Sequence, residues 1–308
     1  MIIAVASGKG GTGKTTVATS LALSLTRNVG DEAGSIDPAH GQPELGRELL
    51  FLDCDVEEPN AALFLDPDLD HRQDVGIPIP EVDLDRCTYC HRCAEVCVWH
   101  AIAVVGQKVL IFPELCHGCG SCTLNCPEGA IHEVLHVMGS LESGRAGPIT
   151  FGHGILNVGE PMAVPIIRQL KASHRIDAGQ GVTILDASPG TSCPVVETMR
   201  GADYVLLVTE PTPFGLHDLR LAVQVARDEL GLPVGVVVNR DGVGDQGVDD
   251  YCAAEGVPIL MRIPLDRRIA GAISGGQALV EALPEYRPQF LALYDQIVGQ
   301  LTSRRESQ

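Results

Sequence analysis

The sequence predicts an α/β protein in which a doubly wound, mostly parallel sheet is interrupted by a smaller α+β domain. Short apolar runs recur along the chain, helical patterns lie between several of them, and eight of the 11 cysteines fall within residues 87–126. Strands that are apolar on both faces are typical of a parallel sheet covered by helices. We therefore expect a main domain formed by 1–81 and 137–308, with an insert at 82–136.

Five apolar runs have the length expected of buried strands. They cover residues 2–6, 49–52, 182–185, 204–208 and 234–238. Helical patterns cover residues 15–25 and 216–230. Residues 27–48 are polar, contain Gly and Pro and show no period. A loop of that length is unusual unless it is functional or mobile.

The last predicted element is a helix at 288–302. It places five large apolar residues at helical spacing, namely Phe290, Leu293, Tyr294, Ile297 and Leu301. A membrane-targeting helix is one interpretation, but the polar face lacks the Lys and Arg that interfacial helices use. We expect a terminal helix that packs on the core.

The composition is that of a globular protein, with 308 residues, 45% hydrophobic and 20% charged. No apolar run approaches the roughly 20 residues that span a bilayer, and no signal-peptide pattern opens the chain. The formal net charge is −18, which disfavours nucleic acid and stable attachment to anionic membranes as partners. We expect a cytoplasmic protein whose cysteines bind metal rather than form disulfides.

A glycine-rich segment, GKGGTGKTT, lies between the first predicted strand and the first predicted helix. It matches the phosphate-loop pattern G-x-x-x-x-G-K-S/T in the required context. The glycines let backbone N–H groups turn toward an anion, and the helix N-terminus adds its positive end. A glycine-rich turn without a ligand fits this context poorly. We expect nucleotide binding by Gly8, Lys9, Gly10, Gly11, Thr12, Gly13, Lys14, Thr15 and Thr16, with Lys14 on the β- and γ-phosphates and the Thr15 hydroxyl on Mg²⁺.

Carboxylates end two of the predicted strands. Asp53 and Asp55 end the run FLDCD, and Asp186 ends the run ILD. Because neighbouring parallel strands end at the same edge of a sheet, these carboxylates would face the phosphates and Mg²⁺. Strand-end aspartates that cap helices are the alternative. The sequence predicts a Mg²⁺ site formed by Thr15, Asp53 and Asp186.

The early lysine of the loop, Lys9, together with these strand ends, resembles the "deviant" phosphate loop of the MinD/ParA superfamily of P-loop ATPases. The resemblance implies ATP and Mg²⁺ as ligands and a nucleotide-dependent dimer, with itself or with a sibling ATPase. In that dimer Lys9 would reach the partner's phosphates and act in catalysis with Lys14. The resemblance also implies that Asp55 orients the attacking water and that Asp186 holds Mg²⁺ through its water shell.

Two further segments resemble parts of that family. Asn239 and Arg240 stand where the family reads the adenine edge, and Pro264 lies in the loop that covers the other face of the base. The 27–48 stretch departs from the family, whose connection at this point is short.

The cysteines form two runs of the same spacing, C-x-x-C-x-x-C-x-x-x-C, and Ala101–Ile102 recurs as Ala130–Ile131 at the same offset of 29. In this spacing the fourth cysteine of each run ligates the other of two [4Fe–4S] clusters. The insert resembles a bacterial two-cluster ferredoxin, although Val98 stands where a proline often follows. Structural zinc is a weaker alternative. We expect one cluster on Cys87, Cys90, Cys93 and Cys126 and the other on Cys116, Cys119, Cys122 and Cys97.

The five histidines of this region are expected to be exposed or packed rather than ligands, because the cysteines complete both clusters. They are His91, His100, His117, His132 and His136. Of the other cysteines, Cys54 and Cys252 are expected in the core. Cys193 stands at the offset from Asp186 that carries a cluster cysteine in nitrogenase-iron-protein-like ATPases. We expect a small buried residue there, with a redox or transient cluster role as the alternative.

Taken together, these features predict an ATPase whose nucleotide-dependent dimer gates electron transfer through two [4Fe–4S] clusters, to or from an unidentified redox partner protein. An iron–sulfur assembly or carrier ATPase is the first alternative. Closed ferredoxin-type sites speak against it, because cargo clusters need exchangeable ligands. A positioning ATPase of the MinD/ParA kind is the second alternative, and the acidic charge speaks against DNA or membrane as its track.

Overall fold

The structure is a computed structural model that describes residues 1–26, 48–174 and 181–306. Within these residues nine strands form one sheet in the order β11-β10-β9-β1-β8-β2-β7-β6-β3. The strands are β1 Ile2–Ala6, β2 Glu48–Asp53, β3 Asp68–Val82, β6 Ile131–Ala146, β7 Ile149–Leu156, β8 Gly181–Asp186, β9 Tyr204–Thr209, β10 Val234–Asp241 and β11 Ile259–Pro264. The first seven strands in the spatial order are parallel, while β6 and β3 run antiparallel.

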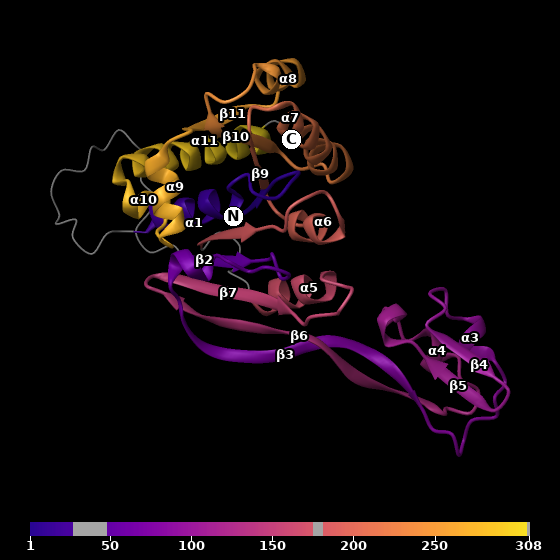
Figure 1. Ribbon diagram of the computed structural model, residues 1–308. Coiled ribbons are helices and arrows are strands. Elements are labelled where there is room, and N and C mark those ends of the chain that lie inside the picture. The colour runs from indigo at the N-terminus through magenta and orange to yellow at the C-terminus, as the bar shows by residue number, and fades with distance from the viewer. Residues whose placement is uncertain (27–47, 175–180, 307–308) are drawn as a thin grey trace.

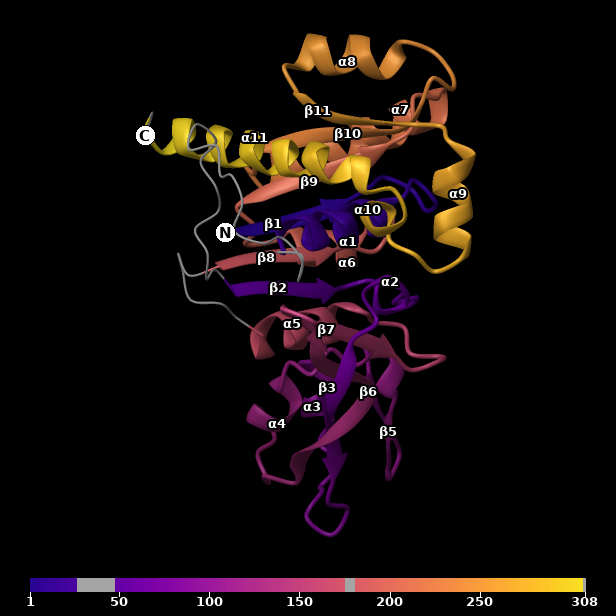
Figure 2. The same cartoon turned by 90° about the vertical axis from the view of Figure 1, so that its left-hand side faces the viewer.

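Helices cover both faces of the parallel part of the sheet (Figures 1 and 2). They are α1 Lys14–Leu25, α2 Ala62–Leu65, α5 Val164–Ser173, α6 Cys193–Met199, α7 Pro213–Val223, α8 Gly247–Glu255, α9 Arg267–Ser274, α10 Leu279–Ala282 and α11 Arg287–Glu306. A π-helix, Gln224–Glu229, continues α7, and a 3₁₀ turn, Pro284–Tyr286, precedes α11. The predicted fold class and all five predicted strands are confirmed, and the helix expected at 216–230 begins earlier, at Pro213.

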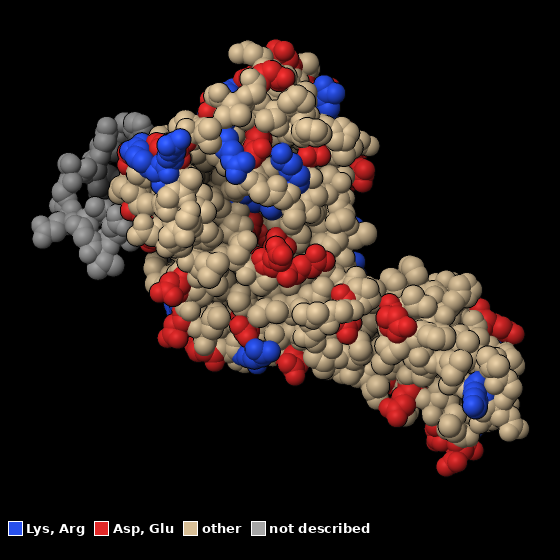
Figure 3. All heavy atoms as spheres, viewed as in Figure 1, with Lys and Arg blue, Asp and Glu red and all other residues tan. Residues whose placement is uncertain are grey.

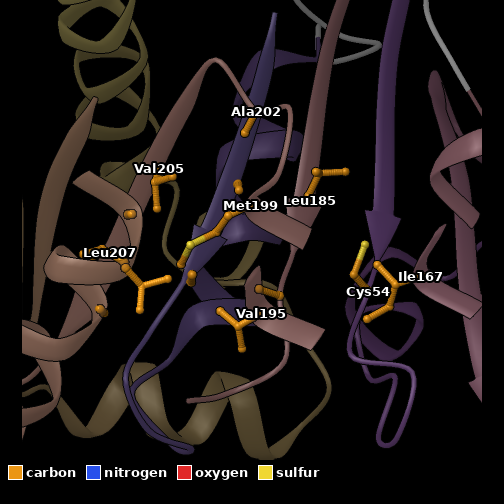
Figure 4. Close-up of a cluster of buried hydrophobic side chains, with 14 of the residues drawn as sticks. Cys54, Ile167, Leu185, Val195, Met199, Ala202, Val205 and Leu207 are labelled. Atoms are coloured by element: carbon orange, nitrogen blue, oxygen red, sulfur yellow. The ribbon is translucent and has the colours of Figure 1, made fainter. Parts of the chain in front are cut away.

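Alternate side chains of each central strand point into two separate hydrophobic cores, as expected for strands buried on both sides. Ile3 and Val5 of β1 face the core beneath α1, α10 and α11, whereas Ala4 and Ala6 face the core beneath α5, α6 and α7. Figure 4 shows part of this second core, in which Cys54 lies beside Ile167 of α5. The C-terminal helix packs on the core as predicted, because Phe290, Leu293, Tyr294 and Ile297 are at most 3% exposed.

Strands β3 and β6 form a long ribbon, here called the arm, which carries the cysteine-rich tip away from the sheet (Figure 1). β6 pairs with β7 only from Gly139 onward, so the residues of β6 before Gly139 pair with β3 alone. At this point the β3–β6 register shifts between Val75 and Gly76, which is a β-bulge. A Cβ on Gly76 would lie 1.8 Å from the carbonyl oxygen of His136, so only glycine fits there. The arm leaves the sheet at this bulge.

The tip of the arm is built from two similar halves. It contains α3 Arg92–Glu95, α4 Ser121–Leu124, the hairpin of β4 Ile102–Val105 and β5 Lys108–Ile111, and a 3₁₀ turn, Pro113–Leu115. The backbone repeats the 29-residue offset of the sequence. Three residues of the first half adopt positive φ angles, namely Tyr89, His91 and His100. Their repeat partners adopt positive φ angles as glycines, namely Gly118, Gly120 and Gly129. The first half thus places side chains in a backbone conformation that favours glycine.

Hydrogen bonds between the halves follow the same symmetry. The N–H of Asp83 donates to the carbonyl of Ala130, and the N–H of Phe112 donates to the carbonyl of Ala101, both at 2.8 Å. Because 112 and 130 are the repeat partners of 83 and 101, the two halves are related by an internal two-fold axis.

The expected insert, 82–136, spans this tip. Most of the loop expected at 27–48 lies outside the described residues.

Candidate functional site

The phosphate loop connects β1 to α1 at the carboxyl edge of the sheet. Gly11 and Gly13 adopt positive φ, and α1 begins at Lys14 without a side-chain cap on its first turn. The uncapped N–H groups of a helix N-terminus are donors for an anion. Gly8 has no room for a side chain, since a Cβ there would lie 2.3 Å from the carbonyl oxygen of Asp218. The local backbone is therefore shaped as a phosphate cradle.

Asp186 lies beside this loop as an unpaired buried carboxyl. It ends β8, next to β1, and is fully buried, yet neither of its oxygens accepts a hydrogen bond from any described residue. Burial raises its pKa to about 7, opposed by the nearby Thr15 hydroxyl and by Lys14. The Thr15 hydroxyl is thus close without meeting the geometry of a hydrogen bond. Mg²⁺ prefers oxygen ligands, so these unpaired oxygens fit a Mg²⁺ ion at this position.

Asp53 differs from Asp186, although the two are register partners on β2 and β8. Its oxygens accept hydrogen bonds from the backbone N–H groups of Asp55, at 3.0 Å, and Ala61, at 2.9 Å. Burial and the neighbouring Asp186 raise the pKa of Asp53 well above its ordinary value. These bonds hold the loop that follows β2, and the Mg²⁺ role of Asp53 stays a prediction.

Asp55 lies at the start of that loop and is only partly buried. Burial raises its pKa, while the charge of Lys14 and a hydrogen bond with Ser188 oppose the shift. A carboxylate near Lys14 can accept a hydrogen bond from a water molecule at the phosphate. The geometry is compatible with the predicted role in orienting water.

Glu210 forms ion pairs with both Lys9 and Arg240, and it is a residue that was not predicted from the sequence. The Lys9 Nζ lies 3.3 Å from one carboxylate oxygen of Glu210, and the Arg240 Nη1 lies 2.5 Å from the other. Glu210 follows β9 directly, at the same edge of the sheet. The signal was available, because an acid after an apolar strand is the pattern that identified Asp53 and Asp186.

Asn239 contacts the phosphate loop itself. Its Nδ2 donates to the carbonyl oxygen of Thr12 at 2.7 Å, and its Oδ1 accepts from the N–H of Arg240 at 2.9 Å. Pro264 ends β11 beside Asp241 of β10 and is exposed. The sheet thus gathers most predicted nucleotide residues at one edge, and Pro264 lies on the strand farthest from β1 at that end of the sheet. The adenine-reading roles stay predictions.

In the tip, the eight repeated cysteines surround two cavities, four to each. One cavity is lined by Cys87, Cys90, Cys93 and Cys126, and the other by Cys97, Cys116, Cys119 and Cys122. Each set therefore takes three cysteines from one run and the fourth from the other, as the spacing predicts. Among the described residues, no three His, Cys, Asp or Glu side chains gather closely enough to hold a single metal ion.

Backbone groups support these sulfurs in a repeated way. The N–H of Ala101 donates to the Cys97 Sγ, and the N–H of Ala130 donates to the Cys126 Sγ, both at 3.3 Å. Thiolate sets with N–H···S hydrogen bonds are the donor set of [4Fe–4S] clusters. The residues present therefore fit two such clusters, and the cluster ligation itself stays a prediction.

Comparison with known proteins places the chain in a family. Residues 1–41 match a ParA family described as an NUBPL iron-transfer P-loop NTPase, and residues 109–132 match a 4Fe-4S binding domain. The uncharacterized protein MJ0578 of Methanocaldococcus jannaschii is 34% identical over 224 residues, 72% of each chain. The uncharacterized protein MJ0579 of the same organism is 29% identical over 289 residues, 91% of this chain and 92% of that one.

Solved structures share the fold. The cell division ATPase MinD of Pyrococcus furiosus gives a TM-score of 0.55 at 21% identity and covers 97% of this chain and 98% of that one. The septum site-determining protein MinD of Pyrococcus horikoshii, complexed with Mg-ADP, gives 0.54 at 19%, covering 96% and 95%. This chain belongs to the family of MJ0578, and its fold is that of the MinD/ParA-type P-loop NTPases. Its second sequence match adds a 4Fe–4S binding domain to that fold.

Cys193 of this P-loop NTPase is exposed, so the expectation of a buried residue there is wrong. The residue opens α6, and its side chain faces a cavity outside the core rather than the sheet. Cys54 and Cys252 are buried, as predicted. Burial raises the pKa of the Cys54 thiol, and it raises that of Cys252 to about 11, so both thiols are inert at neutral pH.

The histidines of the NTPase insert are exposed or packed, as expected. Four are exposed, and His136 is bonded to Glu160 at 3.0 Å. His117 stacks on Trp99 with ring centroids 3.6 Å apart, at the rim of the cavity lined by Cys97 and Cys116. No described helix is both long and apolar enough to cross a membrane.

Proposed function

We propose that this P-loop NTPase is an ATPase whose nucleotide-dependent dimer couples ATP hydrolysis to electron transfer through two [4Fe–4S] clusters. The observation that carries the proposal is the sorting of the eight cysteines into two crossed sets of four, on an arm rooted in the sheet that bears the phosphate loop. Closed four-thiolate sites of this kind retain their clusters and serve electron transfer.

At the phosphate site, Lys14 and the first N–H groups of α1 would bind the β- and γ-phosphates. Thr15 and Asp186 would hold Mg²⁺, which supplies charge neutralisation on the phosphate oxygens. Asp55 would orient a water molecule in line with the bond to the leaving ADP. The water oxygen forms the new bond to phosphorus and passes a proton to a γ-phosphate oxygen, while the bond to the β-phosphate oxygen breaks and ADP carries away the electron pair. Lys9 of a second protomer would offset the charge that develops on the γ-phosphoryl group.

The partner protein is expected to be a basic redox protein. The chain has a formal charge of −18, and Asp and Glu side chains appear on both the main body and the tip in Figure 3. Charge complementarity between partners raises the rate of encounter. The same charge speaks against nucleic acid and anionic membranes as binding partners.

The decisive experiment compares cluster reduction rates under anaerobic conditions without nucleotide, with ADP and with ATP. We expect the rate or the potential to depend on nucleotide in the wild type and not in Lys14→Ala. Identical cluster reduction rates in all three nucleotide states of the wild type would contradict the proposed coupling, even if ATP and both clusters are bound.

An iron–sulfur carrier is the second candidate, and two observations favour it. The family matched by residues 1–41 is described as an iron-transfer NTPase. In addition, Cys90 and Cys119, which are repeat partners, are exposed and open to an acceptor. Incubation of the loaded protein with an apo-ferredoxin separates the candidates, because a carrier loses its iron to the acceptor whereas an electron-transfer protein keeps it.

A further inference from the structure

Helix α5 packs between two parts of the molecule (Figure 1). One is α6, which begins shortly after β8 ends at Asp186. The other is the root of the arm, the bulge at Gly76 where β3 and β6 leave the sheet. Its buried face, Ile166, Ile167 and Leu170, is fully enclosed against the sheet. Glycines of the sheet make room for it, because a Cβ on Gly139 or Gly154 would lie 2.6 or 2.7 Å from Ile166. Because Ile166 packs directly on these glycines, a shift of α5 is coupled to β6, the strand that continues into the arm, and to β7.

On one side α5 is bonded to the end of α6. The Lys171 Nζ donates to the carbonyl oxygens of Glu197, Thr198 and Arg200 at 2.7, 3.0 and 2.7 Å. The last carbonyl groups of a helix lack partners within the helix, so Lys171 serves as the C-terminal cap of α6. Arg168, one turn earlier, pairs with the Glu197 carboxylate at 3.0 Å. α6 itself begins at Cys193, seven residues after Asp186.

On the other side α5 is bonded to the root of the arm. The Gln169 Nε2 donates to the carbonyl oxygen of Gly76 at 2.7 Å. Gly76 is the bulge residue at which β3 and β6 leave the sheet. A bulge bends a ribbon and unpairs one residue, so a side chain that fixes its carbonyl also fixes the direction of the strands beyond it. Gln169 therefore holds the arm at its point of bending.

A cavity of about 530 Å³ adjoins these contacts. Glu57 from the loop after Asp55, Cys193 from the start of α6 and His117 from the tip of the arm all line it. The cavity is open to solvent and no side chain fills it, so the loops and the tip have room to approach or separate there. Movement at the nucleotide edge can therefore change the arm without breaking the core.

We propose that α5 transmits the nucleotide state of the phosphate site to the arm, and that Gln169 is the residue that positions the arm for this transmission. The proposal rests on nucleotide binding at the phosphate loop, which is part of the proposed function, but not on electron transfer. Binding of Mg²⁺ and triphosphate at Asp186 displaces the start of α6, Lys171 and Arg168 carry the displacement into α5, and Gln169 carries it to Gly76.

The test uses the full-length, cluster-loaded protein and hydrogen–deuterium exchange with and without a non-hydrolysable ATP analogue. The wild type should change its exchange rates at arm residues 76–82 and 131–137 by about fivefold or more, the lower end of typical allosteric couplings. Gln169→Glu keeps the size of the side chain and replaces its N–H donor with an acceptor. In this variant we expect the nucleotide-dependent change in the arm to be lost, while analogue affinity and the cluster absorption spectrum stay as in the wild type.

The matched control is Gln224→Glu, an exposed glutamine of the π-helix far from the arm, which should behave as wild type. Gln169→Met is the second variant, and it removes the donor without adding a charge, in case the new carboxylate of Gln169→Glu perturbs folding. A full nucleotide response of the arm in a folded Gln169 variant overturns the proposal, and so does a wild-type arm that ignores bound analogue. If the arm responds but cluster reduction does not, the electron-transfer function fails and the transmission stands.

Discussion

The ammonium group of Lys9 lies 3.3 Å from the carboxylate of Glu210 in its own chain. Glu210 is 9% exposed and is also bonded to Arg240, whereas the Lys9 side chain is about one-third exposed. A lysine that acts on a partner's phosphates must first leave this contact. The ion pair with Glu210 therefore competes with assembly of the proposed dimer.

Glu210→Gln should strengthen nucleotide-dependent self-association. The amide oxygen can still accept from Arg240, but the charge that retains Lys9 is gone. An ion pair whose lysine is partly exposed, as here, is worth about 1 kcal/mol, so the association constant should rise by about fivefold. Sedimentation velocity with a non-hydrolysable ATP analogue measures the change. Arg240→Gln is the control, compared at saturating analogue because Arg240 is itself a predicted nucleotide residue; it leaves Lys9 as the one remaining partner of Glu210 among the described residues and should weaken association. A Glu210→Gln protein that associates no better than wild type would remove Glu210 from this role.

Asp186→Asn should stabilise the protein without metal and abolish its response to Mg²⁺. Burial raises the pKa of Asp186 from 3.8 to about 7, so the protonated form favours folding and the metal-free fold loses stability as pH rises from about 4 through about 7. At pH 8 without Mg²⁺ the variant should melt higher by about 2 °C or more. With Mg-ADP the wild type should gain in melting temperature and the variant should not.

Asp53→Asn serves as the contrast for that measurement. Because Asp53 accepts two backbone N–H bonds, an amide there places a donor against a donor. It should lower the melting temperature with and without metal. If Asp186→Asn also lowers the melting temperature in metal-free buffer at pH 8, burial of the Asp186 carboxylate does not destabilise the fold as the structure indicates.

Cys97→Ser and Cys122→Ser should damage the same cluster, although the two residues belong to different runs. Both line one cavity, while Cys93 lines the other. The double variant Cys97→Ser/Cys122→Ser should keep about half of the iron, held by the undisturbed cluster. The double variant Cys97→Ser/Cys93→Ser should lose both clusters. Equal iron loss in the two double variants, measured by iron analysis of the anaerobically purified proteins, would contradict the crossed ligand sets.

His100→Gly should raise the thermal stability of the tip. His100 adopts φ +54°, and its repeat partner Gly129 adopts the same conformation at φ +55°. A side chain in this region of backbone space costs about 1 kcal/mol or more, against a smaller entropic cost for glycine. The temperature at which cluster absorbance is lost should rise in His100→Gly and fall in Gly129→Ala. A fall in both variants would show that the His100 side chain stabilises the tip by more than its backbone strain.

The motifs of this chain were predictable because they depend on local spacing. The strand–loop–helix context of residues 8–16 and the two cysteine runs each carry their chemistry within one short segment. The arm was not predictable in the same way. The first half of strand β3, residues 68–74, is mostly polar, and its second half contains Pro78 and Pro80, which argue against a strand. It tolerates them because β6 is its sole neighbour in the described sheet, so the missing N–H groups fall on the open edge.

Relationships between distant segments were equally hidden. Glu210 approaches Lys9 because β9 lies next to β1 in the sheet, and strand order is a property of the whole fold. Gln169 reaches Gly76 across 93 residues of sequence. Cys193 was misjudged because burial at the first turn of a helix depends on which neighbours pack against it.

The chain enters and leaves the cysteine-rich tip through two adjacent strands that pair with each other, and the seven parallel strands of the described sheet do not take part in the detour. Such a hairpin can become longer or shorter, or carry a different domain at its tip, without a change in the order of the parallel strands. A 4Fe–4S binding domain could thus be acquired by an existing P-loop NTPase in a single genetic insertion, and the same site offers protein engineers a place to insert other cofactor-binding domains.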